Sequence, residues 1–261
     1  MRLADHRNNE AAQSMDFNAI SNAEFAQIEW RNDHPYSTIF DDVYFSSDDG
    51  LAETEYVFLQ GNDLNHRWST LAANTFTIIE TGFGTGLNFC CAAKLWLEIA
   101  PAHAVLNFYS VEKYPLALPA ITQALQLWPP LNAISLPLLA QYSELLSSGS
   151  PVLLFNQRIK LTLTLGDATE QLSQHNIKTD AWFLDGFAPS KNPEMWQSAL
   201  FTQMARLSQA NTTFATFTSA GVVKRGLSTA GFDVKKRVGF GKKREMLHGK
   251  WLGLNHALNH A

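Results

Sequence analysis

The segment FTIIETGFGTGLNF (76–89) decides the fold of this chain. It begins with a short apolar run of the kind that forms a buried strand, and three glycines then follow at every second position. A loop so poor in side chains lets a ligand approach its backbone, and it leads into a helix expected from Leu87 until Pro101 stops it. This order predicts the first unit of an α/β sheet that binds a ligand at the turn.

Strand-like and helix-like patterns alternate after this unit. We expect strands at 106–112, 152–155, 159–165, 181–185 and 212–218, and helices at 114–128, 131–148 and 220–230. Another helix is expected to be capped by Asn192 and to start at Pro193. FDVKKRV (232–238) and REMLHG (244–249) predict a closing antiparallel pair. The alternation predicts a doubly wound, mostly parallel Rossmann-like sheet.

The residues ahead of the sheet predict a small N-terminal β extension. The stretch FDDVYFSSDDGLAETEYVFLQGN (40–62) contains two short runs, VYF (43–45) and YVFL (56–59), around the turn-forming DDG. These runs predict a β-hairpin packed on the core.

Composition restricts the class of protein. The 261 residues suffice for one sizeable core, and 46% hydrophobic with 17% charged residues argues against disorder. No apolar run approaches the ~18 residues that span a membrane, and the first residues lack the apolar stretch of a secretory signal. Adjacent Cys90 and Cys91 cannot join distant segments, and the histidines show no metal-binding spacing. We therefore expect a cytoplasmic protein without a metal site or a membrane partner.

The glycine spacing separates two classes of cofactor. In Gly82-Phe-Gly84-Thr-Gly86 the third glycine comes one residue earlier than in the dinucleotide fingerprint G-x-G-x-x-G, and the lysine of a P-loop is missing. E-x-G-x-G-x-G, starting here at Glu80, is typical of S-adenosyl-L-methionine (SAM) methyltransferases. Glu80 is expected under the loop, where it orders the loop or meets the amino end of the methionine through water. A purely structural turn is the alternative.

Acidic residues end the next two strands. Glu112 lies 26 residues after Gly86, where one carboxylate accepts hydrogen bonds from both ribose hydroxyls, although NAD sites use the same acid. Asp167 ends the following strand and is suited to accept from an adenine amine, whereas its plain alternative is a helix cap. Glycine loop, ribose acid and adenine acid in this order favour SAM over NAD.

The stretch DAWFLDGFAPSKNPEMW (180–196) carries the chemistry. Asp185 ends an apolar strand and is expected to project into the cofactor crevice. Asp185-Gly-Phe187-Ala-Pro189 is a loose variant of the D/N-P-P-Y/F motif, in which the acid grips an amine and the aromatic ring stacks on a base. A carboxylate that accepts amine protons orients the lone pair and stabilises developing positive charge. The alternative is that Asp185 only caps the turn.

A basic segment lies near the C-terminus. KKRVGFGKKR (235–244) carries six positive charges, although the net charge of the chain is −4. It is either a solvated face or a rim that binds phosphates.

Several of these motifs together resemble a known family. FDDVYFS, ETEYVFL, E-x-GFGTGLNF, DAWFLDGFAPSKNPEMW, ATFTSAG and GFGKKREML, in this order, are similar to the methyltransferase part of MnmC. MnmC is a bacterial bifunctional family of tRNA 5-methylaminomethyl-2-thiouridine biosynthesis. The resemblance covers about residues 36–249. It implies SAM-dependent methylation of the 5-aminomethyl group of 5-aminomethyl-2-thiouridine at wobble position 34, giving 5-methylaminomethyl-2-thiouridine.

The resemblance also implies roles for individual residues. The three glycines would line the cofactor, Glu112 would take the ribose and Asp167 the adenine end, and Asp185 would face the transferred methyl and the substrate amine. The implied RNA partner, a tRNA anticodon loop, would contact Phe187 and Pro189 and lay its phosphates on the basic rim. The rim residues are Lys242, Lys243 and Arg244, together with Lys235, Lys236 and Arg237.

The resemblance sets the expected domain organisation. We expect an N-terminal extension over 1–70, a SAM-dependent methyltransferase domain over 71–250 and a tail over 251–261. Bifunctional members of the family continue into an FAD domain with its own fingerprint, which this sequence lacks, so we expect no FAD and a stand-alone or truncated form. An FAD-dependent domain or protein would supply the substrate. The alternatives are an amine methyltransferase acting on a protein or small molecule, and an NAD-dependent oxidoreductase.

Overall fold

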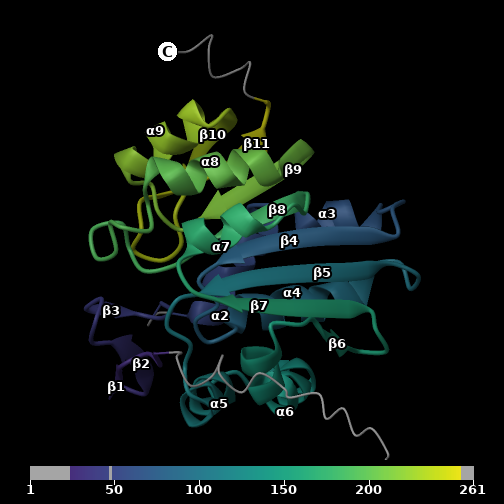
Figure 1. The fold of residues 1–261 in the computed structure, drawn as a ribbon, viewed down its shortest axis with the longest axis vertical. Helices are drawn as coiled ribbons and strands as arrows, with labels where there is room; N and C mark the ends of the chain where they lie inside the picture. Colours follow the sequence, from purple (N-terminus) through teal and green to yellow (C-terminus); the bar gives the residue numbers. More distant parts are fainter. Residues whose placement is uncertain (1–23, 47–48, 254–261) are drawn as a thin grey trace, which may run out of the picture.

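The computed structural model describes residues 24–46 and 49–253 (Figure 1). Within this part the main sheet has eight strands in the order β10-β11-β9-β8-β4-β5-β7-β6. The strands are β4 (Thr75–Thr81), β5 (Val105–Glu112), β6 (Val152–Leu154), β7 (Ile159–Leu165), β8 (Thr179–Leu184), β9 (Ser208–Thr216), β10 (Phe232–Val238) and β11 (Glu245–Trp251). Five central strands run parallel, β10 and β11 close one edge as an antiparallel pair, and β6 is antiparallel at the other edge. The predicted fold class is confirmed.

The strand order reverses at β4. The chain builds outward from β4 through β5 to β7, and then returns to the other side of β4 as β8 and β9. Ligands in such sheets bind beyond the carboxyl ends of the strands at this reversal. Glu80 on β4 and Asp185 after β8 therefore come from the two strands that flank the switch point.

Helices cover both faces of the sheet, because its central strands are apolar on both sides. The helices are α3 (Leu64–Ser69), α4 (Leu87–Ile99), α5 (Leu118–Gln126), the short 3₁₀ turn η2 (Pro129–Leu131), α6 (Asn132–Ser148), α7 (Ala168–Gln174), α8 (Ser198–Leu207) and α9 (Gly221–Thr229). Ile78 packs into the core shared with α4, α5 and α6, and its neighbour Ile79 packs into the core shared with α7, α8 and α9. Figure 1 shows α5 and α6 at the opposite end of the molecule from α8 and α9.

The N-terminal region differs from the predicted hairpin. Its three-stranded antiparallel sheet consists of β1 (Ile28–Arg31), β2 (His34–Ser37) and β3 (Asp42–Val43). The predicted strand YVFL (56–59) is wrong, because it lies in a helix formed by α2 (Gly50–Thr54) and the π-helical turn η1 (Glu55–Gln60).

The physical reason for the helix is visible at its start and in its packing. The Asp49 carboxylate accepts a hydrogen bond from the Ala52 amide and so caps the helix. Val57, Phe58 and Leu59 are all buried, since the helix packs against both α4 and β9. A short apolar run buried on every side gives no period that separates strand from helix. The predicted domain boundary at residue 70 stays a prediction, and residues 1–23 and 254–261 of the expected extension and tail lie outside the described part.

A second difference is the start of α8. The predicted cap at Asn192 is wrong, because the helix begins at Ser198. The Asn192 and Lys191 amides instead both donate to the Ala188 carbonyl, and the Trp196 indole donates to the Phe187 carbonyl. These bonds hold residues 186–197 as a compact loop at the end of β8, and Asn192 lines a cavity there.

Candidate active site

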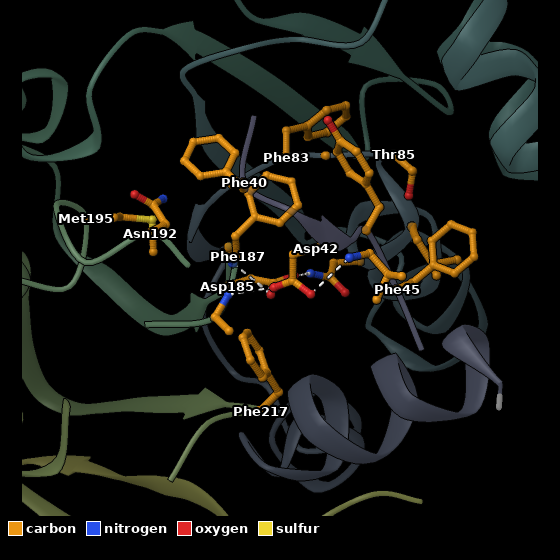
Figure 2. A pocket seen from close by; sticks show the side chains of 18 of the residues that line it. Phe40, Asp42, Phe45, Phe83, Thr85, Asp185, Phe187, Asn192, Met195 and Phe217 are labelled. Atoms are coloured by element: carbon orange, nitrogen blue, oxygen red, sulfur yellow. Dashed lines mark hydrogen bonds between the residues drawn. The ribbon is translucent and has the colours of Figure 1, made fainter. Parts of the chain in front are cut away.

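A cavity of about 400 Å³ opens at the carboxyl ends of β4, β5, β7 and β8 (Figure 2). Its size is in the range of cofactor and small-ligand sites. Most of the predicted site residues line it: Gly82, Gly84, Glu112, Asp167, Asp185, Phe187, Lys242 and Lys243. The topology thus brings together residues that are up to 161 positions apart, from Gly82 to Lys243.

The glycine loop has a backbone that side chains would disturb. Gly82 and Gly84 have φ values of +80° and +51°, in the left-handed region that favours glycine. A Cβ atom on Gly82 would lie 3.2 Å from Cα of Gly186, and one on Gly84 would lie 3.3 Å from the Tyr44 ring. The two glycines therefore let the loop turn tightly between the β8 loop and the N-terminal sheet while its backbone borders the cavity.

Glu112 is tied to this loop. Its Oε2 accepts a hydrogen bond from the Gly84 amide at 2.9 Å, and its Oε1 accepts one from the Tyr114 amide at 2.9 Å. Burial raises the pKa of Glu112, and these backbone donors oppose that shift. Because Glu112 lines the cavity, its carboxylate is placed to accept hydrogen bonds from a ligand there.

Asp167 caps a helix, which was the alternative to a ligand-binding role, and it also lines the cavity. It is the N-cap of α7, and its Oδ1 accepts from the amides of Thr169 and Glu170 at 2.9 and 3.2 Å. Both bonds use one oxygen, so Oδ2 is left for a ligand amine. Capping and ligand binding are therefore compatible at this position.

Asp185 is held from three directions at the switch point. Its Oδ1 accepts from the Gly186 amide at 2.8 Å, and its Oδ2 accepts from the Asn88 side-chain amide at 2.7 Å. The Thr81 hydroxyl bonds both the amide and the carbonyl of Asp185 and so fixes its backbone. Desolvation by burial raises the pKa of Asp185 to about 7. Such a carboxylate exchanges a proton readily near neutral pH.

Glu80 lies beneath the loop, as predicted, but does not reach the cavity. Its side chain is fully buried, its Oε2 accepts from the Ser110 hydroxyl at 2.6 Å, and its Oε1 has no hydrogen-bond partner. Desolvation raises its pKa well above the usual range of a glutamate. An ordering role under the loop fits this position better than contact with a ligand.

Other predicted residues also lie outside the cavity lining. They are Gly86, Pro189 and Arg244, together with the rim residues Lys235, Lys236 and Arg237. Gly86 has φ +73° and immediately precedes α4, so it serves the turn into the helix. Pro189 lies within the β8 loop, one residue beyond Ala188, which does line the cavity. Arg244 is exposed immediately before β11.

Residues of the N-terminal sheet and its β2–β3 turn contact the loop that follows Asp185. Asp42 accepts a hydrogen bond from the Ala188 amide at 3.0 Å, and the rings of Phe40 and Phe187 stack with centroids 4.6 Å apart. Figure 2 shows these two rings on one side of Asp185 and Phe217 on the other. Sequence analysis missed Phe40 and Asp42, because nothing in their local pattern shows which distant loop they contact.

Sequence analysis also missed a second acid at the cavity. Glu53 on α2 is buried and forms an ion pair with Lys243, with Nζ to Oε1 at 2.7 Å. The next residue, Thr54, donates to the Asn88 Oδ1 at 2.9 Å, and Asn88 in turn donates to Asp185. Glu53 was hidden because its segment was predicted as a turn and strand, although the acid in DDGLAE is visible in the sequence.

Several side chains of the basic segment already have partners within the protein. Lys236 pairs with Glu245 at 2.6 Å, and Lys235 lies 3.5 Å from Asp233. The Arg237 guanidinium stacks on the Tyr56 ring at 4.0 Å. From this segment, the cavity is lined by Phe240, Lys242 and Lys243.

Comparison with known proteins identifies the class. A family model described as S-adenosyl-L-methionine-dependent methyltransferase matches residues 129–251. The tRNA 5-methylaminomethyl-2-thiouridine biosynthesis bifunctional protein MnmC of Methylobacillus flagellatus is 53% identical over 226 residues, which are 87% of this chain and 35% of that protein. The chain is thus similar to S-adenosyl-L-methionine-dependent methyltransferases, over residues 129–251 by the family model and over 87% of its length by this relative. The prediction of SAM rather than NAD is thereby confirmed.

Other similar proteins agree with this methyltransferase assignment. MnmC of Chromobacterium violaceum is 53% identical over 228 residues, 87% of this chain and 34% of its own length. The chain thus spans about a third of the length of these relatives. The crystal structure of MNMC2 from Aquifex aeolicus shares the fold, with a TM-score of 0.70 and 22% identity, over 89% of this chain and 72% of that one. The resemblance to the methyltransferase part of MnmC is confirmed.

No group of three or more His, Cys, Asp or Glu side chains among residues 24–46 and 49–253 has an arrangement that would hold a metal ion. No helix in the same residues is both long and apolar enough to cross a membrane.

Proposed function

We propose that this methyltransferase transfers a methyl group to the 5-aminomethyl group of 5-aminomethyl-2-thiouridine at tRNA position 34, giving 5-methylaminomethyl-2-thiouridine. The observation that carries the proposal is Asp185, a carboxylate fixed at the switch point of a SAM-type sheet with both oxygens directed by hydrogen bonds. The name of the relatives, MnmC, supports the tRNA substrate. A tRNA substrate implies a cytoplasmic enzyme.

The residues at the ends of β4, β5 and β7 fit the cofactor. The backbone of Gly82 and Gly84 would border the methionine part, Glu112 would accept from the ribose hydroxyls, and Oδ2 of Asp167 would accept from the adenine amine. When bound, SAM supplies a methyl group on a positively charged sulfur, which needs only a well-placed nitrogen lone pair. The protein's task is therefore to deprotonate and align the amine.

Asp185 performs this task in the proposed mechanism. A primary alkyl amine carries a proton at neutral pH, and its nitrogen has no lone pair until that proton leaves. A carboxylate with a pKa of about 7 accepts the proton and keeps the amine within hydrogen-bond reach. The bonds from Asn88 and Gly186 prevent the carboxylate from rotating, so the accepting lone pairs stay directed at one place.

The RNA lies on the rim in this proposal. Lys242 and Lys243 border the cavity and Arg244 is exposed beside them, so phosphates of the anticodon loop would contact this end of the basic segment. Phe187 and Pro189, two residues further along the loop, would contact the uracil ring, which must leave its stack to enter the cavity. An FAD-dependent oxidoreductase domain or protein would supply the aminomethyl group.

The test is transfer of labelled methyl from SAM to two tRNA preparations. One carries 5-aminomethyl-2-thiouridine at position 34, and the other has the same sequence without the modification. We expect label only in the first. Equal labelling of both would refute the substrate, and labelling of neither, with a small-molecule or protein amine labelled instead, would favour the alternative amine methyltransferase.

A further inference from the structure

Glu53 has a position that the mechanism above does not explain. Its side chain is 11% exposed, yet it lines the same cavity as Asp185, the proposed proton acceptor. A buried carboxylate needs a partner, since its desolvation is otherwise costly. The partner here is the ammonium group of Lys243, with Nζ 2.7 Å from Oε1.

The Lys243 ammonium is held by two different groups. Besides the carboxylate of Glu53, it faces the ring of Phe217 with Nζ 4.4 Å from the centroid. Phe217 also lines the cavity, on the side of Asp185 opposite to Phe187 (Figure 2). A carboxylate and an aromatic face together form the recognition chemistry of an alkylammonium ion.

The two acids belong to one connected structure. Thr54, next to Glu53, donates to Asn88, and Asn88 donates to Asp185. Asp185 senses the charges of both Glu53 and Lys243, so with Asp185 ionised these three groups together carry a net negative charge. A second cation that enters would neutralise it.

We propose that Glu53 and Phe217 form the subsite that binds the ammonium group of the substrate, and that Lys243 occupies this subsite until the substrate arrives. The inference rests on the proposed function, because it takes a primary amine as the substrate. The incoming ammonium replaces Lys243 at Glu53 and lies within reach of Asp185, which then accepts its proton. No other bond forms or breaks in this exchange.

The location of Lys243 allows the exchange. It lies in the turn between β10 and β11, and its side chain is 44% exposed, whereas Glu53 is held on the helix formed by α2 and η1. The lysine can therefore move outward while the acid stays in place. Once displaced, the Lys243 ammonium lies on the rim where RNA phosphates are expected. Binding of the substrate amine and binding of the RNA backbone therefore favour each other.

The experiment measures how strongly the protein prefers tRNA with the amine. Dissociation constants are determined, with S-adenosylhomocysteine present, for tRNA bearing 5-aminomethyl-2-thiouridine and for the same tRNA without it. The wild type is compared with Glu53→Gln and with Glu55→Gln, a control that removes an exposed acid two residues away and outside this cavity. Phe217→Leu is the second test variant, and the affinity for S-adenosylhomocysteine reports whether each variant is folded.

We expect the preference for the amine-bearing tRNA to fall about tenfold or more in Glu53→Gln, because a charge-assisted hydrogen bond is lost. Phe217→Leu should lower it about threefold, and Glu55→Gln should leave it unchanged. If Glu53 only anchored Lys243, the variant would weaken both tRNAs equally, and an unchanged preference overturns the inference. A wild type that methylates the amine but shows no preference in binding also overturns it. A wild type that transfers no methyl to the amine refutes the proposed function instead.

Discussion

The two halves of the cavity are built in different ways. The cofactor half comes from consecutive units of the sheet, where Gly84 donates its amide to Glu112 and Asp167 caps the next helix. The amine half is assembled from segments far apart in the chain, with Glu53 on α2, Asp185 after β8 and Lys243 in the β10–β11 turn. Backbone geometry fixes the first half, and contacts between side chains fix the second.

The difference separates binding from chemistry. The half that we propose for the cofactor resembles what many sheets of this class require, since glycine turns and strand-end acids suit a common ligand. The half that we propose for the amine has two acids, Glu53 and Asp185. Asn88 bonds both Asp185 and Thr54, and Thr54 lies on the same helix as Glu53. Variants in one half should therefore change one measured quantity and leave the other intact.

The largest expected effect is that of Asp185→Ala on methyl transfer. Loss of the proton acceptor should lower the single-turnover rate by about 10²- to 10⁴-fold, the usual contribution of general base catalysis. Affinity for SAM, measured by calorimetry, should change by less than about threefold, because the proposed cofactor contacts lie at the ends of β4, β5 and β7. A parallel loss of SAM binding would show that the halves are not separate.

Glu112→Ala should have the converse effect. It removes the proposed acceptor for the two ribose hydroxyls and leaves the Gly84 amide without its partner. We expect SAM to bind about 100-fold more weakly, from one or two lost charge-assisted bonds. At saturating SAM the rate of methyl transfer should recover to within about tenfold of the wild type. Failure to recover would place Glu112 in the chemistry as well.

The two halves of the cavity also differ in how well the sequence predicts their residues. Gly82, Gly84, Glu112 and Asp167 sit at strand ends whose positions follow from an apolar run and its turn, so the alternation of the chain was enough to find them. Glu53 lies on a helix whose apolar residues show no helical period in the sequence. Its proposed role also requires Lys243, which is 190 residues away. No local pattern records such a pairing.

The basic rim should have a moderate effect on RNA affinity alone. Replacing Lys242, Lys243 and Arg244 together by Ala should weaken binding of unmodified tRNA about tenfold and flatten its salt dependence, because fewer counterions are released. Filter binding across a salt series measures both. The matched control is Lys235→Ala with Lys236→Ala, two lysines already close to Asp233 and Glu245. An equal loss in this control would move the RNA contact along the segment.

The smallest effect concerns stability, through Glu80. Burial raises its pKa in the folded protein above the unfolded value, so the folded state binds a proton more tightly. The unfolding free energy contributed by this group is then full below about pH 4, and it declines as the pH rises toward the folded pKa. The free energy of unfolding of Glu80→Gln, measured with urea, should rise by at least about 1 kcal/mol relative to that of the wild type between pH 5 and pH 8. A constant difference between the two proteins across this range would show that Glu80 does not titrate in this way.

The product of the reaction tests the central claim most directly. Amine-bearing tRNA is incubated with the protein and SAM, digested to nucleosides and analysed by mass spectrometry. The account predicts one new nucleoside, 5-methylaminomethyl-2-thiouridine, which gains a single methyl on the side-chain nitrogen and is absent when Asp185→Ala replaces the wild type. A methyl group on any other nucleoside, or unchanged 5-aminomethyl-2-thiouridine with the wild type, would contradict it.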